Sequence, residues 1–111
     1  MSVHATTRYG SVFRADLFAG TTALVTGGGS GIGRCVAHEL SSLGATVIIT
    51  GRKIEKLERV AGEISEDGGA VHYAAFDIRD EEAVEGEIAA LVDAHGPIKL
   101  LVNNAGGQFP A

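Results

Sequence analysis

The sequence has few of the residues that build disulfide scaffolds, metal centres and membrane spans. Its 111 residues include no tryptophan, two prolines and a single cysteine, Cys35. One cysteine excludes an internal disulfide and a cysteine-rich metal site. No apolar run approaches the ~18 residues of a membrane-spanning helix, and the first residues lack the basic and apolar segments of a secretion signal. We therefore expect a cytoplasmic chain with no membrane partner.

Charge and histidine placement exclude two further classes of protein. The net charge of −5 provides no basic footprint for nucleic acid. The four histidines share no ligand spacing, so we expect no metal site and no catalytic histidine among His4, His38, His72 and His95. Cys35, on the first turn of a packed helix, is expected to be a small core residue. The class of protein that remains after these exclusions is a globular domain that binds a small molecule.

Apolar runs and helical periodicities alternate along the chain after an aperiodic start. Residues 1–20 show no period and are interpreted as an N-terminal arm, whereas residues 21–111 are expected to form the first part of a domain about twice as long. The predicted strands cover residues 22–26, 46–50, 70–77 and 99–103. Three amphipathic helices between them have the expected buried stripes Ile32, Val36, Leu40 and Leu43; Ile54, Leu57, Val60 or Ala61 and Ile64; and Val84, Ile88, Leu91 and Val92. This alternation predicts an α/β fold, the N-terminal part of a doubly wound parallel-sheet Rossmann fold with strand order 3-2-1-4.

A glycine-rich turn joins the first predicted strand to the first helix. It reads Thr-Gly-Gly-Gly-Ser-Gly-Ile-Gly from Thr26 to Gly33. Glycines let the chain turn tightly and let a pyrophosphate approach the backbone N–H groups at the helix start. A P-loop is excluded because Arg34 and Cys35 replace its lysine and its hydroxyl residue. We expect phosphate contacts from Gly27, Gly29, Ser30, Gly31, Ile32 and Gly33.

Three motifs in this order resemble the short-chain dehydrogenase/reductase family. They are T-G-x-x-x-G-x-G in the glycine turn, the pair Asp77-Ile78 after the third strand, and Asn103-Asn104-Ala105-Gly106 after the fourth. The resemblance implies that Asp77 and Ile78 lie beside the adenine of a dinucleotide. It also implies that Asn104, Ala105 and Gly106 approach its ribose and nicotinamide, with Asn103 structural. Asp77 could instead cap a helix or pair with Arg79, and both asparagines could be plain turn formers.

The end of the second strand indicates which dinucleotide is preferred. NAD-binding folds place a carboxylate there for the ribose 2′-hydroxyl, but this sequence has Gly51 followed by Arg52 and Lys53. A guanidinium binds a 2′-phosphate bidentately, whereas a carboxylate would repel it. The pattern therefore favours NADP(H) over NAD(H). The alternative interpretation of the two cations is a solvated helix start.

The resemblance implies hydride transfer between nicotinamide and a carbonyl or alcohol. It also implies a catalytic tyrosine as acid/base, a lysine four residues later that lowers the pKa of that tyrosine, and a serine that orients the substrate. No Tyr-x-x-x-Lys occurs in these residues, because Phe13 follows Tyr9 and Asp77 follows Tyr73 at that spacing. We therefore assign no catalytic residue and expect an inactive cofactor-binding fragment of a longer, homo-oligomeric oxidoreductase. The alternative is a non-catalytic nucleotide-binding or regulatory module.

The two ends of the sequence resemble one subgroup of this family. Residues 13–20 and the final stretch from Gly106 to Ala111 resemble enoyl-CoA reductases and citronellol dehydrogenases. An enoyl-CoA therefore joins a carbonyl or alcohol as an expected substrate.

Overall fold

The computed structural model describes residues 13–104, in which strands and helices alternate as the sequence predicts. The elements are β1 (Thr22–Thr26), α1 (Gly31–Ser42), β2 (Thr46–Gly51), α2 (Ile54–Glu66), β3 (Ala70–Ala75), α3 (Glu81–His95) and β4 (Leu100–Asn103). β3 ends two residues earlier than predicted, and β4 begins one residue later. Asp77 therefore lies in the short segment after β3 and not in the sheet.

The four strands form one parallel sheet in the order β3-β2-β1-β4. This confirms the predicted α/β class and the predicted strand order. The register pairs Thr26 of β1 with Thr50 of β2 and with Asn103 of β4. The carboxyl ends of the strands therefore meet at one edge, where doubly wound folds bind their ligands.

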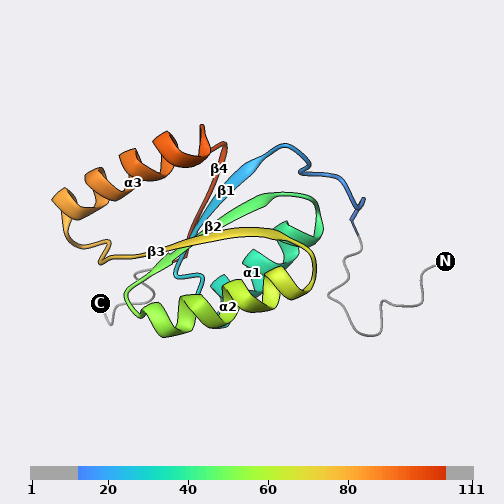
Figure 1. Ribbon diagram of the computed structural model, residues 1–111, viewed down its shortest axis with the longest axis horizontal. Helices are drawn as coiled ribbons and strands as arrows, with labels where there is room; N and C mark the ends of the chain where they lie inside the picture. Colours follow the sequence, from blue (N-terminus) through green and yellow to red (C-terminus); the bar gives the residue numbers. More distant parts are fainter. Residues whose placement is uncertain (1–12, 105–111) are drawn as a thin grey trace.

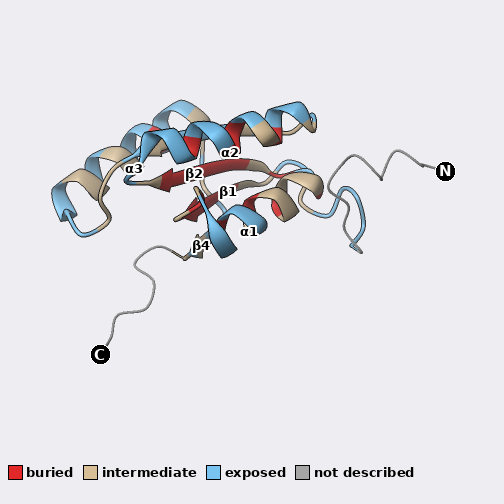
Figure 2. Ribbon diagram, turned by 90° about the horizontal axis from the view of Figure 1, so that it is seen from below, coloured by how far each residue is buried: buried red, intermediate tan, exposed pale blue. Residues whose placement is uncertain are grey.

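Helices cover both faces of the sheet, with α1 and α2 on one face and α3 on the other (Figure 1). Side chains alternate along β1, so Ala23 and Val25 pack toward α1 and α2 while Leu24 packs toward α3. β2 does the same, and its Ile48 and Ile49 are fully buried. The central strands and the inner sides of the helices form the core (Figure 2).

The sequence prediction of the buried face of α1 was partly wrong. Leu40 is buried as predicted, and so is Leu43 just after the helix, but the other buried positions are Gly33 and Ala37, while Ile32 is 72% exposed. Cys35 is exposed too, so the expectation of a small core residue was wrong. Gly33 must face inward because it packs against the glycine turn, and successive helical residues rotate by about 100°. Residues on either side of Gly33 therefore point away from the sheet.

The other two helices follow their predictions to different degrees. α2 buries Leu57, Val60, Ala61 and Ile64 as expected, but Ile54, also expected to be buried, is 39% exposed. α3 buries only Leu91, although its start is capped as expected, with the Asp80 carboxylate accepting from the Ala83 N–H at 3.1 Å. The face that α3 covers is consequently the less tightly packed one.

The described part of the predicted arm contacts the domain. The Phe18 N–H donates to the Leu43 carbonyl at 2.8 Å, and the Phe18 side chain packs against the core. Residues 1–12 of the arm lie outside the described residues. Within residues 13–104, no helix combines the length and apolar character needed to cross a bilayer, and no group of side chains could hold a metal ion.

Candidate functional site

The glycine turn between β1 and α1 has a backbone that side chains would block. Gly27 and Gly31 have φ angles of 71° and 59°, in the left-handed region that favours glycine. A Cβ on Gly33 would overlap the carbonyl oxygen of Gly27. The N–H groups of Gly27 and Gly28 donate to the Thr50 carbonyl at 2.8 and 3.1 Å, which fixes the turn to β2.

The start of α1 leaves its N–H groups open to an anion. Ser30 is the N-cap residue, yet its side chain makes no capping hydrogen bond, and the first turn contains no acidic residue. The first N–H groups of a helix have no partner within the helix, and the helix dipole makes this end positive. The turn and helix start therefore have the geometry with which backbone N–H groups can bind an anion.

A cleft of about 350 Å³ lies at the carboxyl ends of β1, β2 and β3. Three separate segments line it: the glycine turn, the start of α2, and the stretch after β3. The lining residues are Gly27, Gly29, Ser30, Gly51, Arg52, Lys53, Lys56, Leu57, Phe76, Asp77, Ile78 and Arg79.

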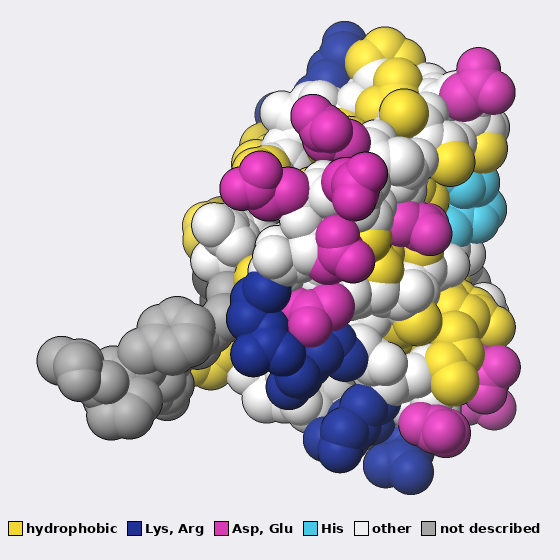
Figure 3. Space-filling view, turned by 90° about the vertical axis from the view of Figure 1, so that its left-hand side faces the viewer, with side chains coloured by type: hydrophobic (Ala, Val, Ile, Leu, Met, Phe, Trp, Pro, Cys, Tyr) yellow, Lys and Arg dark blue, Asp and Glu magenta, His cyan; other side chains and the backbone are white. Residues whose placement is uncertain are grey.

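Three cations in this cleft have no carboxylate partner among residues 13–104. Arg52, Lys53 and Lys56 line the cleft from the β2–α2 connection and the first turn of α2, and no ion pair involves them. Lysine and arginine side chains gather on this side of the molecule, below several carboxylates (Figure 3). At the end of β2, Gly51 stands where a carboxylate would oppose a phosphate. The combination suits a ligand with several negative charges.

Asp77 lies in the opposite wall of the cleft and is paired with Arg79. Its carboxylate accepts from the Arg79 backbone N–H at 2.9 Å and from Nη2 at 3.0 Å. The hydrogen bonds from Arg79 lower the pKa of Asp77 to about 2, and the more distant charge of Arg52 adds slightly to this shift. The ion pair that the sequence left open as an alternative is therefore present, and Asp77 still lines the cleft beside Ile78.

The end of β4 is tied to the glycine turn through Thr26. The Asn104 N–H donates to Thr26 Oγ1 at 2.9 Å, and the Asn104 side-chain amide donates to the Gly27 carbonyl at 3.4 Å. Thr26 Oγ1 can donate to Asn103 Oδ1, 3.2 Å away. Asn104 thus contacts Gly27 of the glycine turn but does not itself line the cleft. Ala105 and Gly106 lie outside the described residues.

The structure brings together six of the residues predicted from the sequence and adds others. Gly27, Gly29, Ser30, Arg52, Asp77 and Ile78 all line the cleft, while Gly31, Ile32 and Gly33 begin α1 next to it. Sequence reasoning missed Lys56, Leu57, Phe76 and Arg79 as lining residues. Lys56 could have been found, since it follows Arg52 by four residues in a predicted first helical turn.

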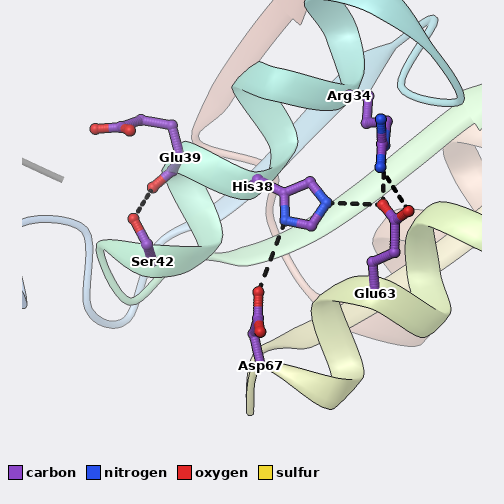
Figure 4. Close-up of polar contacts among 6 residues, drawn as sticks. All are labelled: Arg34, His38, Glu39, Ser42, Glu63 and Asp67. Carbon is purple, nitrogen blue, oxygen red and sulfur yellow. Dashed lines mark hydrogen bonds and ion pairs between the residues drawn. The ribbon is translucent and has the colours of Figure 1, made fainter. Parts of the chain in front are cut away.

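A second polar cluster joins α1 to α2 outside the cleft. Glu63 accepts from Arg34 Nε at 2.9 Å and lies 2.9 Å from His38 Nε2, while Asp67 lies 3.9 Å from His38 Nδ1 (Figure 4). The hydrogen bond from Arg34 is the main cause that lowers the pKa of Glu63 to about 2. None of these four residues lines the cleft. The cluster holds the two helices together beside their shared sheet face.

Comparisons with known proteins agree with this geometry. Residues 21–111 match the family model described as short chain dehydrogenase. The citronellol catabolism dehydrogenase AtuB of Pseudomonas aeruginosa is 60% identical with a TM-score of 0.84, over 86% of this chain and 40% of that one. A metagenomic short-chain oxidoreductase in complex with NADP is 42% identical with a TM-score of 0.78, over 80% of this chain and 40% of that one.

Curated relatives extend well beyond this chain. A probable 2,4-dienoyl-CoA reductase of Caenorhabditis elegans is 39% identical over 104 residues, which are 92% of this chain and 34% of the relative. The chain spans about a third of the length of the curated relatives it matches. Because the family model covers most of the sequence and all three predicted motifs, this chain belongs to the short-chain dehydrogenase/reductase family.

Proposed function

We propose that this chain forms the cofactor-binding part of an NADP(H)-dependent oxidoreductase. The observation that carries the proposal is the cleft in which an uncapped helix start meets three unpaired cations. The pyrophosphate would lie on the glycine turn, against the N–H groups of Gly29, Ser30, Gly31 and Ile32. The contact between Gly33 and Gly27 leaves no room for a side chain, so the turn has the close backbone packing that such a phosphate site needs.

Arg52 is the proposed ligand of the 2′-phosphate, with Lys53 as a second cation. Arg52 follows Gly51 directly and has no ion-pair partner within residues 13–104. Its planar guanidinium can donate two parallel hydrogen bonds to a phosphate. The NADP bound to the metagenomic relative supports this assignment of the cofactor.

The adenine and nicotinamide ends of the cofactor are assigned by the same proposal. Asp77 would accept from the exocyclic amine of adenine, beside the backbone of Ile78, because both line the far wall of the cleft. Asn104, Ala105 and Gly106 follow β4, where a backbone of small residues would approach the ribose and nicotinamide. The hydrogen bond from Asn104 to Gly27 shows that this segment starts next to the glycine turn.

When bound, the nicotinamide would donate a hydride to a carbonyl or an enoyl-CoA, or accept a hydride from an alcohol. The similarity to a citronellol catabolism dehydrogenase and to a dienoyl-CoA reductase supports these substrate classes. No Tyr-x-x-x-Lys occurs in the 111 residues, so we expect them to bind cofactor without turning over substrate. We also expect the full-length protein to be a cytoplasmic homo-oligomer.

Substitution of Arg52 tests the proposed cofactor in the full-length protein. A hydrogen bond to a charged group contributes ~1.5–3 kcal/mol, or roughly 10- to 150-fold in affinity. Arg52→Ala should lower the affinity for NADPH by that factor and leave the affinity for NADH nearly unchanged, because NADH lacks the 2′-phosphate. Gly51→Asp with Arg52→Ala should reverse the preference. Titrations of both dinucleotides measure this, with Arg59→Ala as the control on the exposed side of α2.

Two results would count against the proposal. Equal losses of NADPH and NADH affinity in Arg52→Ala would make Arg52 a surface or structural residue. Binding of NADPH by a full-length protein that turns over none of the three substrate classes would favour a non-catalytic nucleotide-binding module.

A further inference from the structure

In the wall of the cleft, Arg79 forms four hydrogen-bond contacts with the carboxylate of Asp77. The Arg79 backbone N–H and Nε donate to Asp77 Oδ1 at 2.9 and 3.1 Å. Nη2 donates to Oδ2 at 3.0 Å, and Nε also reaches Oδ2 at 3.3 Å. The backbone bond and the two arms of the guanidinium leave the carboxylate little freedom to rotate.

The backbone that carries Asp77 is fixed on both sides. The Phe76 N–H donates to the Gly51 carbonyl at 2.8 Å, which ties the segment to the end of β2. The Asp80 N–H donates to the Asp77 carbonyl at 3.0 Å, and Asp80 itself caps α3. Asp77 therefore combines a fixed backbone with a fixed side chain, although its side chain is 37% exposed.

The two arginines that line the cleft are in opposite electrostatic states. Arg52 has no carboxylate partner among the described residues, whereas the charge of Arg79 is compensated by Asp77. An exposed ion pair contributes little to stability, so the fold does not depend on this pair. Arg79 is thus poorly suited to attract a phosphate and well suited to orient its partner.

The occupied acceptor positions of Asp77 indicate what that orientation achieves. A carboxylate has about four acceptor positions. Arg79 supplies three N–H groups, because its single Nε hydrogen is shared between Oδ1 at 3.1 Å and Oδ2 at 3.3 Å. These donors occupy both positions of Oδ1 and one of Oδ2, which leaves one position on Oδ2 for a further donor. A single fixed acceptor suits a single donor, such as the exocyclic amine of adenine. In hypoxanthine a carbonyl oxygen replaces this amine, so two hydrogen-bond acceptors would face each other with no donor between them.

We propose that Arg79 is a positioning residue that makes the cleft selective for adenine by holding Asp77 as a fixed acceptor. This inference rests on the proposed function, because it assumes that the cleft binds a dinucleotide. Arg79 itself contacts neither phosphate nor base in this account. Its loss should therefore change the discrimination between bases more than the affinity for phosphate.

The test compares NADPH with its hypoxanthine analogue in the full-length protein. The unaltered protein should bind NADPH more tightly than the analogue by roughly 10- to 150-fold, the value of a hydrogen bond to a charged acceptor. Arg79→Gln should reduce this ratio by roughly fivefold or more, because the bidentate fork is lost. Arg79→Lys keeps the charge without the fork, so it should reduce the ratio too.

Two further variants sharpen the test. Asp77→Asn should abolish the preference, since its amide can donate to the hypoxanthine oxygen as well as accept from adenine. Arg34→Gln is the matched control, because Arg34 makes a similar bidentate pair with Glu63 outside the cleft. It should leave the ratio unchanged. Should Arg79→Gln fail to fold, Arg79→Lys and Asp77→Asn decide the question.

The contradicting results separate this inference from the proposed function. A ratio that stays unchanged in both Arg79 variants, while both dinucleotides weaken equally, would overturn the positioning role. An unaltered protein that binds NADPH and the analogue equally would overturn it as well, and would leave the 2′-phosphate assignment standing. Failure of the unaltered protein to bind NADPH at all would instead refute the proposed function.

Discussion

The two faces of the sheet differ in how completely the described residues pack against them. On the face covered by α1 and α2, the core contains ten buried residues from the two strands, the two helices and the connection after α1. On the face covered by α3, only Leu24, Ile48 and Leu91 are buried together. Leu101 of β4, which pairs with Leu24 on this face, is 60% exposed. The same sheet thus has one well-filled side and one sparsely filled side.

The candidate site belongs to the well-filled side. The glycine turn leads into α1, and the unpaired cations come from the start of α2, so both helices of that face contribute to the cleft. A Cβ built on Gly29 would lie 3.1 Å from the Lys56 Cβ, which shows how closely the turn approaches α2. Tight packing beneath the glycine turn holds its backbone N–H groups in place, which would favour binding of the proposed phosphate.

The largest expected effect compares one leucine on each face. Leu57 of α2 is 1% exposed and Leu91 of α3 is 8% exposed. Leu57→Ala should lower the free energy of unfolding by about 2–5 kcal/mol, whereas Leu91→Ala should cost about 2 kcal/mol or less because its surroundings can collapse more easily. Chemical denaturation of both variants measures the difference. An equal or larger loss in Leu91→Ala would show that the faces are packed alike.

A smaller effect separates the turn from the helices that flank it. Gly33→Ala places a methyl group against the Gly27 carbonyl and should cost about 1–3 kcal/mol of stability. Gly62 in α2 and Gly86 in α3 have open space around them, so alanine there should stabilise by about 0.5–1 kcal/mol. Thermal unfolding of the three variants checks this. A neutral Gly33→Ala would mean that the turn and α1 are not in close contact.

The smallest effect is a difference in acid sensitivity between the faces. Burial, and the charge of His95 stacked on it, lower the pKa of His72 below its ordinary value of 6.5. The unfolded chain therefore takes up this proton first, and stability should fall as the pH drops below about 6.5. Glu63 joins α1 to α2 with its pKa lowered from 4.5 to about 2, so its contribution is lost only as the pH falls from 4.5 toward 2.

Melting temperatures between pH 7 and pH 3 test this order. His72→Gln should flatten the pH dependence of the melting temperature between pH 7 and pH 5. Glu63→Gln should lower the melting temperature by a constant amount above about pH 4.5, and its difference from the unaltered protein should shrink only below that pH. If Glu63→Gln changed the slope between pH 7 and pH 5 and His72→Gln did not, the assignment of the two pH ranges to the two faces would be wrong.

The sequence predicts the strands and their order because both depend on strong local patterns. β1 and β2 are uninterrupted β-branched or apolar runs, and each helix after them ends at a glycine. The inner face of α1 could not be predicted from periodicity, because two small residues, Gly33 and Ala37, face the sheet while the larger Ile32 faces solvent. The buried face of α1 is instead set by the close packing of Gly33 against the glycine turn.

The site could be predicted in part for a similar reason. Residues at strand ends, such as Arg52 and Asp77, are placed by topology alone, since parallel strands end at one edge. The pairing of Asp77 with Arg79 was left open because an aspartate two residues before an arginine is compatible with several turns. The role of Thr26 as a link to Asn104 was missed, since it depends on two segments far apart in the sequence.

The affinity of the unaltered full-length protein for NADPH and for NADH tests the central claim most directly. Titration of each reduced dinucleotide at one fixed salt concentration gives the two dissociation constants. NADPH should bind at least roughly tenfold more tightly, because Arg52, which has no ion-pair partner among residues 13–104, is expected to bond to the 2′-phosphate that NADH lacks. Equal affinities, or tighter binding of NADH, would contradict the central claim.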